Sequence, residues 1–163
     1  MAEEKPAVLQ TVTPEVIAEA RALVAGADHA ALAVVEPGSG HPLASRVGLA
    51  TLADGTPVIT ISKLAAHRAA LDTDPRCSLL VGDPGKGDPL AHPRITLVCS
   101  AEPIEPGSAA ATEARDRYLA HHPRAGIYID LPDFRFFRFA ILRASFNGGF
   151  GRAYALAGTM LVG

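Results

Sequence analysis

The segment 44–82 constrains the fold more than any other part of the sequence, because the spacing of its apolar residues changes from that of a strand to that of a helix. Residues 45–52 alternate small, apolar and charged side chains, and the Asp54-Gly55 dipeptide that follows is typical of a hairpin turn. Residues 57–62 are rich in β-branched side chains, which pack well on a pleated surface. This part of the segment therefore predicts a β-hairpin.

A short helix and a third strand are expected after the hairpin. Apolar residues from Leu64 to Leu71 recur with the period of a helix. The helix is expected to end before Asp74-Pro75, because proline disfavours a helical conformation in the residue that precedes it. Residues 77–82 are predicted to form a strand again.

A candidate binding site lies at the corner where the second hairpin strand meets this helix. Two hydroxyl and three cationic side chains gather there, namely Thr60, Ser62, Lys63, His67 and Arg68. Arg46, on the neighbouring strand, is expected to reach the same corner. The first turn of a helix presents unpaired N–H groups, so the corner predicts a phosphate site. The alternative is an amphipathic helix whose basic face is simply solvated.

A phosphate alone would be a marginal ligand for this corner. Each charge-assisted hydrogen bond contributes roughly 1.5–3 kcal/mol, so three or four would give about 5–10 kcal/mol before ordering costs. Micromolar binding needs about 8 kcal/mol. The ligand is therefore expected to carry a flat or apolar part in addition to its phosphate.

A series of short motifs runs in a fixed order from about residue 30 to residue 156. They are Arg46-Val47, Ile59-Thr60-Ile61-Ser62, Leu64-x-x-His67, Asp74-Pro75-Arg76, Ser78-Leu79-Leu80-Val81, Asp88-Pro89-Leu90, Pro93-Arg94-Ile95-Thr96-Leu97, Ala101-Glu102-Pro103, Tyr118-Leu119, His122-Pro123 and Gly149-Phe150-Gly151-Arg152-Ala153. This order resembles the FMN-binding split-barrel superfamily, which contains the pyridoxamine 5′-phosphate oxidases, and most closely its haem-utilisation branch. The resemblance implies a mainly β (α+β) fold, a six-stranded antiparallel split β-barrel with peripheral helices. We expect one domain over residues 1–163, with residues 1–12 a flexible N-terminus.

The resemblance also implies a homodimer with FMN at the subunit interface. The residues implied to hold the cofactor are Arg46, Val47, Gly48, Thr60, Ser62, Lys63, His67 and Arg94. The first three would run along the isoalloxazine ring, and the next four would surround the side from the ring to the phosphate. Arg94 would contact the cofactor of the partner subunit, although a plain surface arginine is an equal alternative. The chemistry would belong to the flavin, so no catalytic residue is assigned.

Three functions compete on this basis. The first is an FMN-dependent oxidoreductase acting on an unidentified small-molecule substrate. The second is a haem-binding protein of haem utilisation, although members of that branch commonly carry a further C-terminal domain or tail beyond the point that corresponds to Gly163. The third is a dimeric binding module without a cofactor. A pyridoxamine 5′-phosphate oxidase proper is disfavoured, because the chain has no tryptophan for the substrate segment of that enzyme.

Composition excludes several other classes of protein. The net charge of −2 argues against general nucleic-acid binding, which needs a concentrated basic surface. Residues 1–6 lack the pattern of a signal peptide, and no apolar run approaches the roughly 20 residues of a membrane span. The two cysteines, Cys77 and Cys99, fall in predicted strands and are interpreted as buried thiols. We expect a cytoplasmic protein without a metal site.

The remaining elements are predicted from local patterns. Thr13-Pro14-Glu15 has the signature of a helix start, and Gly26 is expected to end that helix. Ser108 is a plausible cap for a helix that ends at His121. Phenylalanines on both faces of a strand at residues 134–139 predict burial on both sides, inside the barrel and against a second subunit. A core formed within one chain is the alternative.

Overall fold

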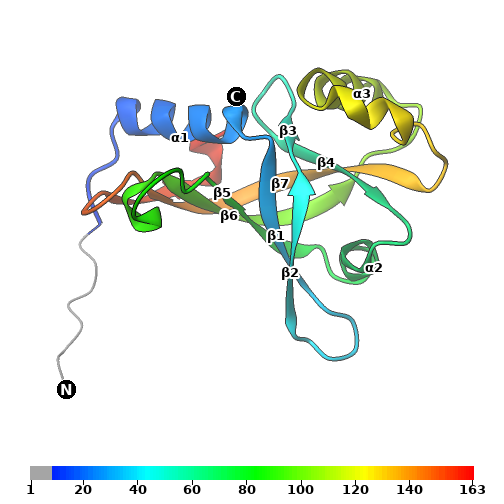
Figure 1. The fold of residues 1–163 in the computed structure, drawn as a ribbon, viewed down its shortest axis with the longest axis horizontal. Helices are drawn as coiled ribbons and strands as arrows, with labels where there is room; N and C mark the ends of the chain where they lie inside the picture. Colours follow the sequence, from blue (N-terminus) through cyan, green and yellow to red (C-terminus); the bar gives the residue numbers. More distant parts are fainter. Residues whose placement is uncertain (1–8) are drawn as a thin grey trace.

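The computed structural model describes residues 9–163 (Figure 1). The elements in chain order are α1 (Pro14–Gly26), β1 (His29–Val35), β2 (Pro42–Gly48), β3 (Ala50–Thr51), β4 (Pro57–Ser62), α2 (Ala66–Thr73), β5 (Arg76–Val81), η1 (Pro89–Ala91), β6 (Arg94–Pro103), α3 (Ala109–His121), η2 (Pro123–Ile127), β7 (Phe134–Asn147), β8 (Ala153–Ala157) and η3 (Gly158–Met160). The three short η segments are 3-10 helices.

The strands form one antiparallel sheet that is curled into a barrel. Their order is β2-β1-β5-β6-β7-β4-β3, and β8 pairs with β7 beside this path. β2 and β3 lie at opposite ends of this order although only Leu49 separates them in the chain. The sheet must therefore bend until its two edges meet, where they do not pair with each other. The predicted split barrel with peripheral helices is confirmed.

The structure has more strands than the six that were predicted. The predicted strand 45–52 is interrupted at Leu49, whose N–H donates to the Asp28 carbonyl at 3.0 Å and whose carbonyl accepts from His122 Nε2 at 2.7 Å. These bonds take the backbone of Leu49 out of the ladder, so one predicted strand becomes β2 and β3. The predicted last segment, residues 152–160, contributes β8.

Two hydrophobic clusters lie on the two faces of the curled sheet. The larger one fills the barrel and includes the buried face of α1; its bulkiest fully buried members include Phe137, Phe139, Phe146, Leu32, Leu49, Ile61, Leu79 and Leu97. The smaller one lies between β3, β4 and α3 and includes Val58, Ile104, Ala114, Tyr118 and Ile129. α3 thus covers part of the outer face of the sheet (Figure 1).

A bulge in β7 changes which of its side chains face the barrel. Val98 of β6 pairs with Arg143, whereas Cys99 pairs with Ile141, so Leu142 is an extra residue in β7. Because side chains alternate between the two faces, one extra residue exchanges the faces. The buried positions are accordingly odd-numbered before the bulge and even-numbered after it.

The aromatic strand β7 is buried on its barrel side and half-buried on its outer side within one chain. Phe137 and Phe139 point into the barrel, whereas Phe136 packs on the cluster beneath α3, where its ring lies 6.0 Å from that of Tyr118. Phe134 lies 5.0 Å from the Tyr128 ring on the same outer side. α3 and the segment after it therefore cover part of the outer face of this strand, and further burial against a second subunit stays a prediction.

Most local signals have the predicted outcome. β4 has the predicted bounds, the Asp54-Gly55 turn joins β3 to β4, and Thr13 Oγ1 accepts a hydrogen bond from Val16 N at 3.4 Å. Both cysteines are buried free thiols. The expected flexible N-terminus lies largely outside the described residues; within them, Gln10 N donates to the Ala153 carbonyl at 2.9 Å. In the part of the chain that the structure describes, no helix has the length and apolarity needed to cross a bilayer.

Candidate cofactor cleft

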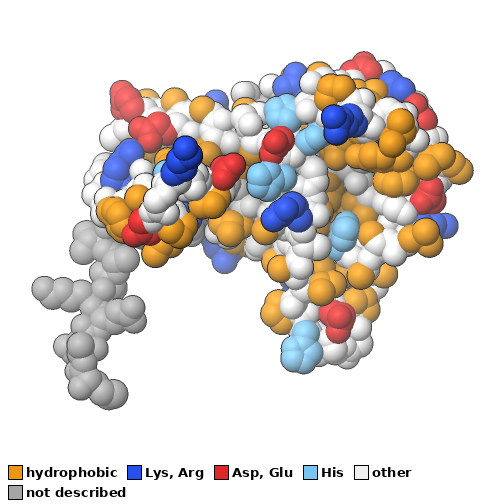
Figure 2. Space-filling view, viewed as in Figure 1, with side chains coloured by type: hydrophobic (Ala, Val, Ile, Leu, Met, Phe, Trp, Pro, Cys, Tyr) orange, Lys and Arg blue, Asp and Glu red, His pale blue; other side chains and the backbone are white. Residues whose placement is uncertain are grey.

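A cleft of about 260 Å³ opens where the two edges of the barrel meet. β2 and β4 form its floor, α2 closes one side, and the end of α3 with the segment 125–134 closes the other. Its lining residues are Arg46, Val47, Gly48, Thr60, Ile61, Ser62, Ala65, His67, Tyr118, Tyr128 and Phe134. In the space-filling view, hydrophobic side chains gather beneath α3, next to histidine and basic side chains (Figure 2).

The structure brings six of the eight predicted site residues together in this cleft: Arg46, Val47, Gly48, Thr60, Ser62 and His67. Lys63 and Arg94 are not among the lining residues. Lys63 is exposed, and Arg94 lies at the start of β6, where its Nη1 donates to the carbonyl of Leu90 at 3.1 Å. Arg94 therefore does not reach the cleft of its own chain.

Gly48 is required by the close approach of Tyr118. A Cβ atom at position 48 would collide with Tyr118 Oη, so only glycine lets this ring lie against β2. Burial raises the pKa of Tyr118 well above its usual value, so its hydroxyl stays protonated. The ring also lies 4.5 Å from that of His122. Tyr118 thus forms a rigid, neutral aromatic wall of the cleft.

His67 presents a neutral imidazole to the cleft. Burial lowers the pKa of His67 below its ordinary value of 6.5, so the ring is uncharged at neutral pH. Its Nδ1 lies 3.4 Å from Ser45 Oγ. A neutral imidazole is the form that ligates metals or exchanges a proton, and it adds no permanent positive charge to the site.

Thr60 has a hydroxyl without a partner. Its Oγ1 is buried, and no hydrogen-bonding group of the described residues reaches it. Buried polar atoms are nearly always hydrogen-bonded, so an orphaned one in the wall of a cleft is an open position for a ligand. This atom can both donate and accept one hydrogen bond from a bound molecule.

Ser62, in contrast, is already fully engaged. Its Oγ donates to Asp133 Oδ2 at 2.7 Å and accepts from Leu64 N at 3.1 Å. Lys63 N donates to the carbonyl of Asp133 at 2.9 Å. The segment just before β7 is therefore bonded to the end of β4 through both its backbone and the side chain of Asp133. The corner thus contains a carboxylate that the sequence did not reveal.

Arg68 does not supply a free cation to this corner. Its side chain is buried, with Nε 3.1 Å from Asp72 Oδ2, Nη1 3.4 Å from the carbonyl of Ile61, and its guanidinium 5.3 Å from the centre of the Phe137 ring. These contacts fasten α2 to the barrel. The expectation of three cationic side chains around the corner is wrong, because only His67 lines the cleft, Arg68 is buried and Lys63 is exposed outside the lining.

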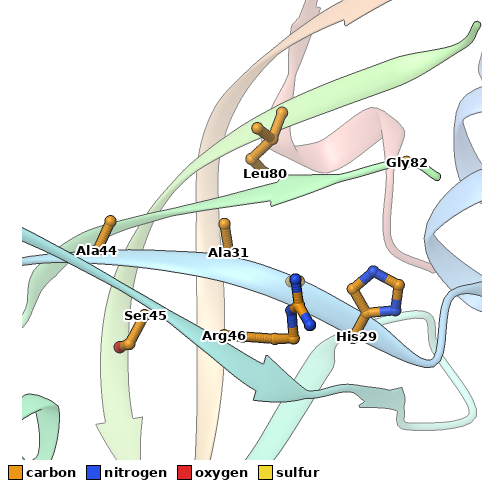
Figure 3. Close-up of a pocket in the computed structure, with 8 residues that line it drawn as sticks. His29, Ala31, Ala44, Ser45, Arg46, Leu80 and Gly82 are labelled. Carbon is orange, nitrogen blue, oxygen red and sulfur yellow. The ribbon is translucent and has the colours of Figure 1, made fainter. Parts of the chain in front are cut away.

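A second groove adjoins the cleft on the other side of β2. It measures about 350 Å³, and small side chains of β1 and β2 line it, with Leu80 of β5. Figure 3 shows Arg46 and His29 side by side at one end of this groove. Arg46 lines both spaces, so the groove and the cleft meet at its side chain.

Four residues in or beside the cleft were not assigned to it from the sequence. Tyr118 occurs in one of the matched motifs but was not assigned to the cofactor, Phe134 was expected only to be buried, and Tyr128 and Asp133 had no signal at all. All four lie more than fifty residues after β4, so only the folded barrel brings them to the hairpin.

Comparison with known proteins places the chain in a family. The family model described as pyridoxamine 5′-phosphate oxidase matches residues 16–148. Non-canonical heme oxygenase HOZ, chloroplastic, of Arabidopsis thaliana is 41% identical over 100 residues, which are 61% of this chain and 29% of that protein. The structure of a heme binding protein from Mycobacterium smegmatis aligns with a TM-score of 0.82 and 35% identity, over 93% of this chain and 61% of that one.

A third likeness concerns the fold alone. Campylobacter jejuni ChuZ aligns with a TM-score of 0.80 at 17% identity, over 94% of this chain and 63% of that chain. The chain therefore spans less than two thirds of each of these three proteins. The descriptions of two of them name haem, which agrees with the predicted likeness to the haem-utilisation branch. Since the family model covers most of the sequence, the chain belongs to the pyridoxamine 5′-phosphate oxidase family of split-barrel proteins.

Proposed function

We propose that this protein binds haem in the cleft between β2, β4 and α2. The observation that carries the proposal is the combination of aromatic walls with a neutral imidazole. Tyr118, Tyr128 and Phe134 offer flat apolar surface, and His67 is uncharged at neutral pH. Haem has large apolar faces and an iron that accepts an imidazole nitrogen, so the chemistry of these side chains fits it.

Each part of haem has a candidate partner among the lining residues. The aromatic side chains would contact the porphyrin, and His67 would ligate the iron. Arg46, at the mouth of the cleft, would pair with a propionate. Haem, when bound, supplies redox chemistry at iron, while this chain would position the ring and exclude water from it. The names of the plant and mycobacterial relatives support the same ligand.

The size of the cleft supports a second copy of the chain as part of the site. Its volume of about 260 Å³ is below the roughly 300–1,000 Å³ of pockets that enclose drug-sized ligands. A haem would extend past Arg46 into the adjoining groove of about 350 Å³, where a further wall is needed to cover it. We propose that a homodimer supplies this wall, as implied for split barrels.

FMN is the second candidate, and one observation favours it. The orphaned Oγ1 of Thr60 offers a hydrogen bond of the kind that a polar flavin edge requires. The predicted contacts to Arg46, Val47 and Gly48 are compatible with a flavin ring, since these residues line the cleft. The phosphate end fits poorly, because Ser62 is engaged by Asp133 and Arg68 is buried. An FMN-dependent oxidoreductase thus stays the second proposal.

A titration with haemin tests the first proposal. We expect a Soret band that saturates at one haem per chain, in a protein that sediments as a dimer. His67→Ala should shift that band and weaken binding at least tenfold. His41→Ala, in the exposed loop between β1 and β2, is the matched control and should change neither. Quenching of FMN fluorescence without a Soret band would favour the flavin, and binding of neither ligand would favour a module without a cofactor.

A further inference from the structure

Asp133 lies directly behind Ser62, a lining residue of the corner of the cleft where a phosphate is expected from the sequence. It is half-buried, it lies just before β7, and its Oδ2 accepts a hydrogen bond from Ser62 Oγ at 2.7 Å. Its backbone carbonyl accepts from Lys63 N at 2.9 Å. The two bonds fix the carboxylate beside the end of β4, next to the start of α2.

This arrangement engages the side-chain hydroxyl that a phosphate would use at this corner, although the backbone N–H groups at the uncapped start of α2 remain. The one hydroxyl hydrogen of Ser62 is directed to Asp133, and the Ser62 oxygen already accepts from Leu64 N. A phosphate ester offers acceptors almost exclusively, so it requires donors and positive charge around it. Ser62 can donate to a phosphate only by giving up its bond to the carboxylate.

The charges around the corner act in the same direction. The Arg68 side chain is buried and paired with Asp72, and Lys63 is exposed outside the lining of the cleft. The Asp133 carboxylate would therefore repel a dianionic phosphate bound beside Ser62, and the buried Arg68, paired with Asp72, would not offset that repulsion.

We propose that Asp133 is a specificity-determining residue that makes this cleft select ring-shaped ligands without a phosphate ester. The inference rests on the proposed function, since it assigns the class of ligand to the same cleft. It also orients the ligand: anionic groups lie toward Arg46, at the open end, and the uncharged part of the ring lies toward Ser62 and Asp133. A tetrapyrrole with carboxylates on one edge satisfies this arrangement, whereas FMN does not.

Riboflavin and FMN are the matched probes, because they share the ring and the ribityl chain and differ by the phosphate. Their dissociation constants are measured by quenching of flavin fluorescence for the native protein and for Asp133→Asn. We expect Asp133→Asn to bind FMN at least tenfold more tightly, with riboflavin affinity unchanged within threefold. Asp116→Asn, on the exposed side of α3, makes the same change in net charge and should leave both constants unaltered.

An equal change for both flavins, or no change for either, overturns the role of Asp133. Asp133→Ser replaces the amide variant if the latter fails to fold. A haemin titration of the same samples separates the two proposals. A normal Soret band with an unaltered ratio of FMN to riboflavin affinity refutes the Asp133 proposal alone. An altered ratio without any Soret band refutes the haem proposal alone and leaves the selection against phosphate in place.

Discussion

Two corners of this molecule join a strand to a helix, and they begin their helices in different ways. Between β6 and α3, Ser108 Oγ accepts a hydrogen bond from Ala111 N at 3.1 Å and donates to the carbonyl of Glu105 at 2.6 Å. Between β4 and α2, Ala65 occupies the cap position and no side chain caps the helix. The available hydroxyl, that of Ser62, is bonded to Asp133 instead.

The difference separates a corner held by local contacts from the corner that forms part of the candidate site. The start of α3 is stabilised by residues adjacent in sequence, and no ligand is needed there. The start of α2 is held by long-range contacts, with Arg68 in the barrel and Ser62 bonded to a residue 71 positions away. An uncapped helix keeps free N–H groups in the cleft wall, at some cost in stability. Four predictions test this contrast.

The largest effect is expected from the side chain that fastens α2. Arg68→Ala removes a buried guanidinium together with its bond to Ile61 and its contact with Phe137, and we expect a loss of about 2–4 kcal/mol in the free energy of unfolding. Urea denaturation measures it. Arg76→Ala is the control: this side chain is 80% exposed and pairs with Asp74 on the surface, so its removal should cost less than about 0.5 kcal/mol. Equal losses for both variants would contradict the role given to Arg68.

A smaller loss is expected at the capped corner. Ser108→Ala should lower the free energy of unfolding by about 1 kcal/mol, because the N–H of Ala111 loses its acceptor at the start of α3. The measurement is again denaturation by urea. Ala109→Gly, at the exposed first position of the helix, is a reference for the effect of backbone freedom alone. If Ser108→Ala has no effect, α3 is held by its packing and not by its cap.

The uncapped corner should gain stability from an introduced cap. Ala65 already has the extended backbone of a cap residue, with φ −75° and ψ 137°, so Ala65→Ser places a hydroxyl where it can accept from the first turn of α2. We expect a gain of about 0.5–1 kcal/mol. Thermal unfolding without ligand measures the gain. Ala69→Ser, on the exposed side of the same helix, should show none. A loss at position 65 would mean that the cleft wall has no room for the hydroxyl.

The smallest effect concerns pH and the imidazole of His67. Its pKa is lowered in the folded protein, so the unfolded chain binds more protons once the pH falls below about 6.5. Stability from this group is complete above that pH and is lost as the pH decreases through the lowered value. The carboxyl groups of Asp28, Asp74 and Asp130 have lowered pKa values too, so they titrate below pH 4 and do not interfere.

His67→Gln tests this assignment by removing the titrating group. Denaturation curves between pH 7.5 and pH 5 should show a smaller loss of stability for the variant than for the native protein. His41→Gln, in an exposed loop, should behave like the native protein. An unchanged pH profile in His67→Gln would mean that the imidazole is as well solvated as in the unfolded chain.

Much of the fold could be predicted because its signals are local. The Asp54-Gly55 turn, the β-branched strand before α2 and the caps Thr13 and Ser108 each depend on residues within a few positions of one another. The interruption at Leu49 depends on bonds to Asp28 and His122, which are distant in sequence. The bulge at Leu142 also has no signal in the amino-acid composition of the strand. It reverses which side chains of β7 face the barrel.

The same distinction applies to the cleft. Its hairpin residues, such as Arg46 and Thr60, could be predicted because one continuous segment carries them. Tyr118 and Asp133 belong to later segments of the chain. The curvature of the sheet brings them next to the hairpin residues. The expected cationic corner was wrong for a similar reason: sequence spacing places Arg68 near the helix start but does not tell which way its long side chain extends.

The passage of the chain from β2 to β3 has a mechanical consequence. A single residue, Leu49, carries the backbone across the seam between the two sheet edges, and its N–H and carbonyl are held by groups outside the sheet. At this end, the separation of the two edges is therefore fixed by covalent connectivity and by two hydrogen bonds, and not by strand pairing.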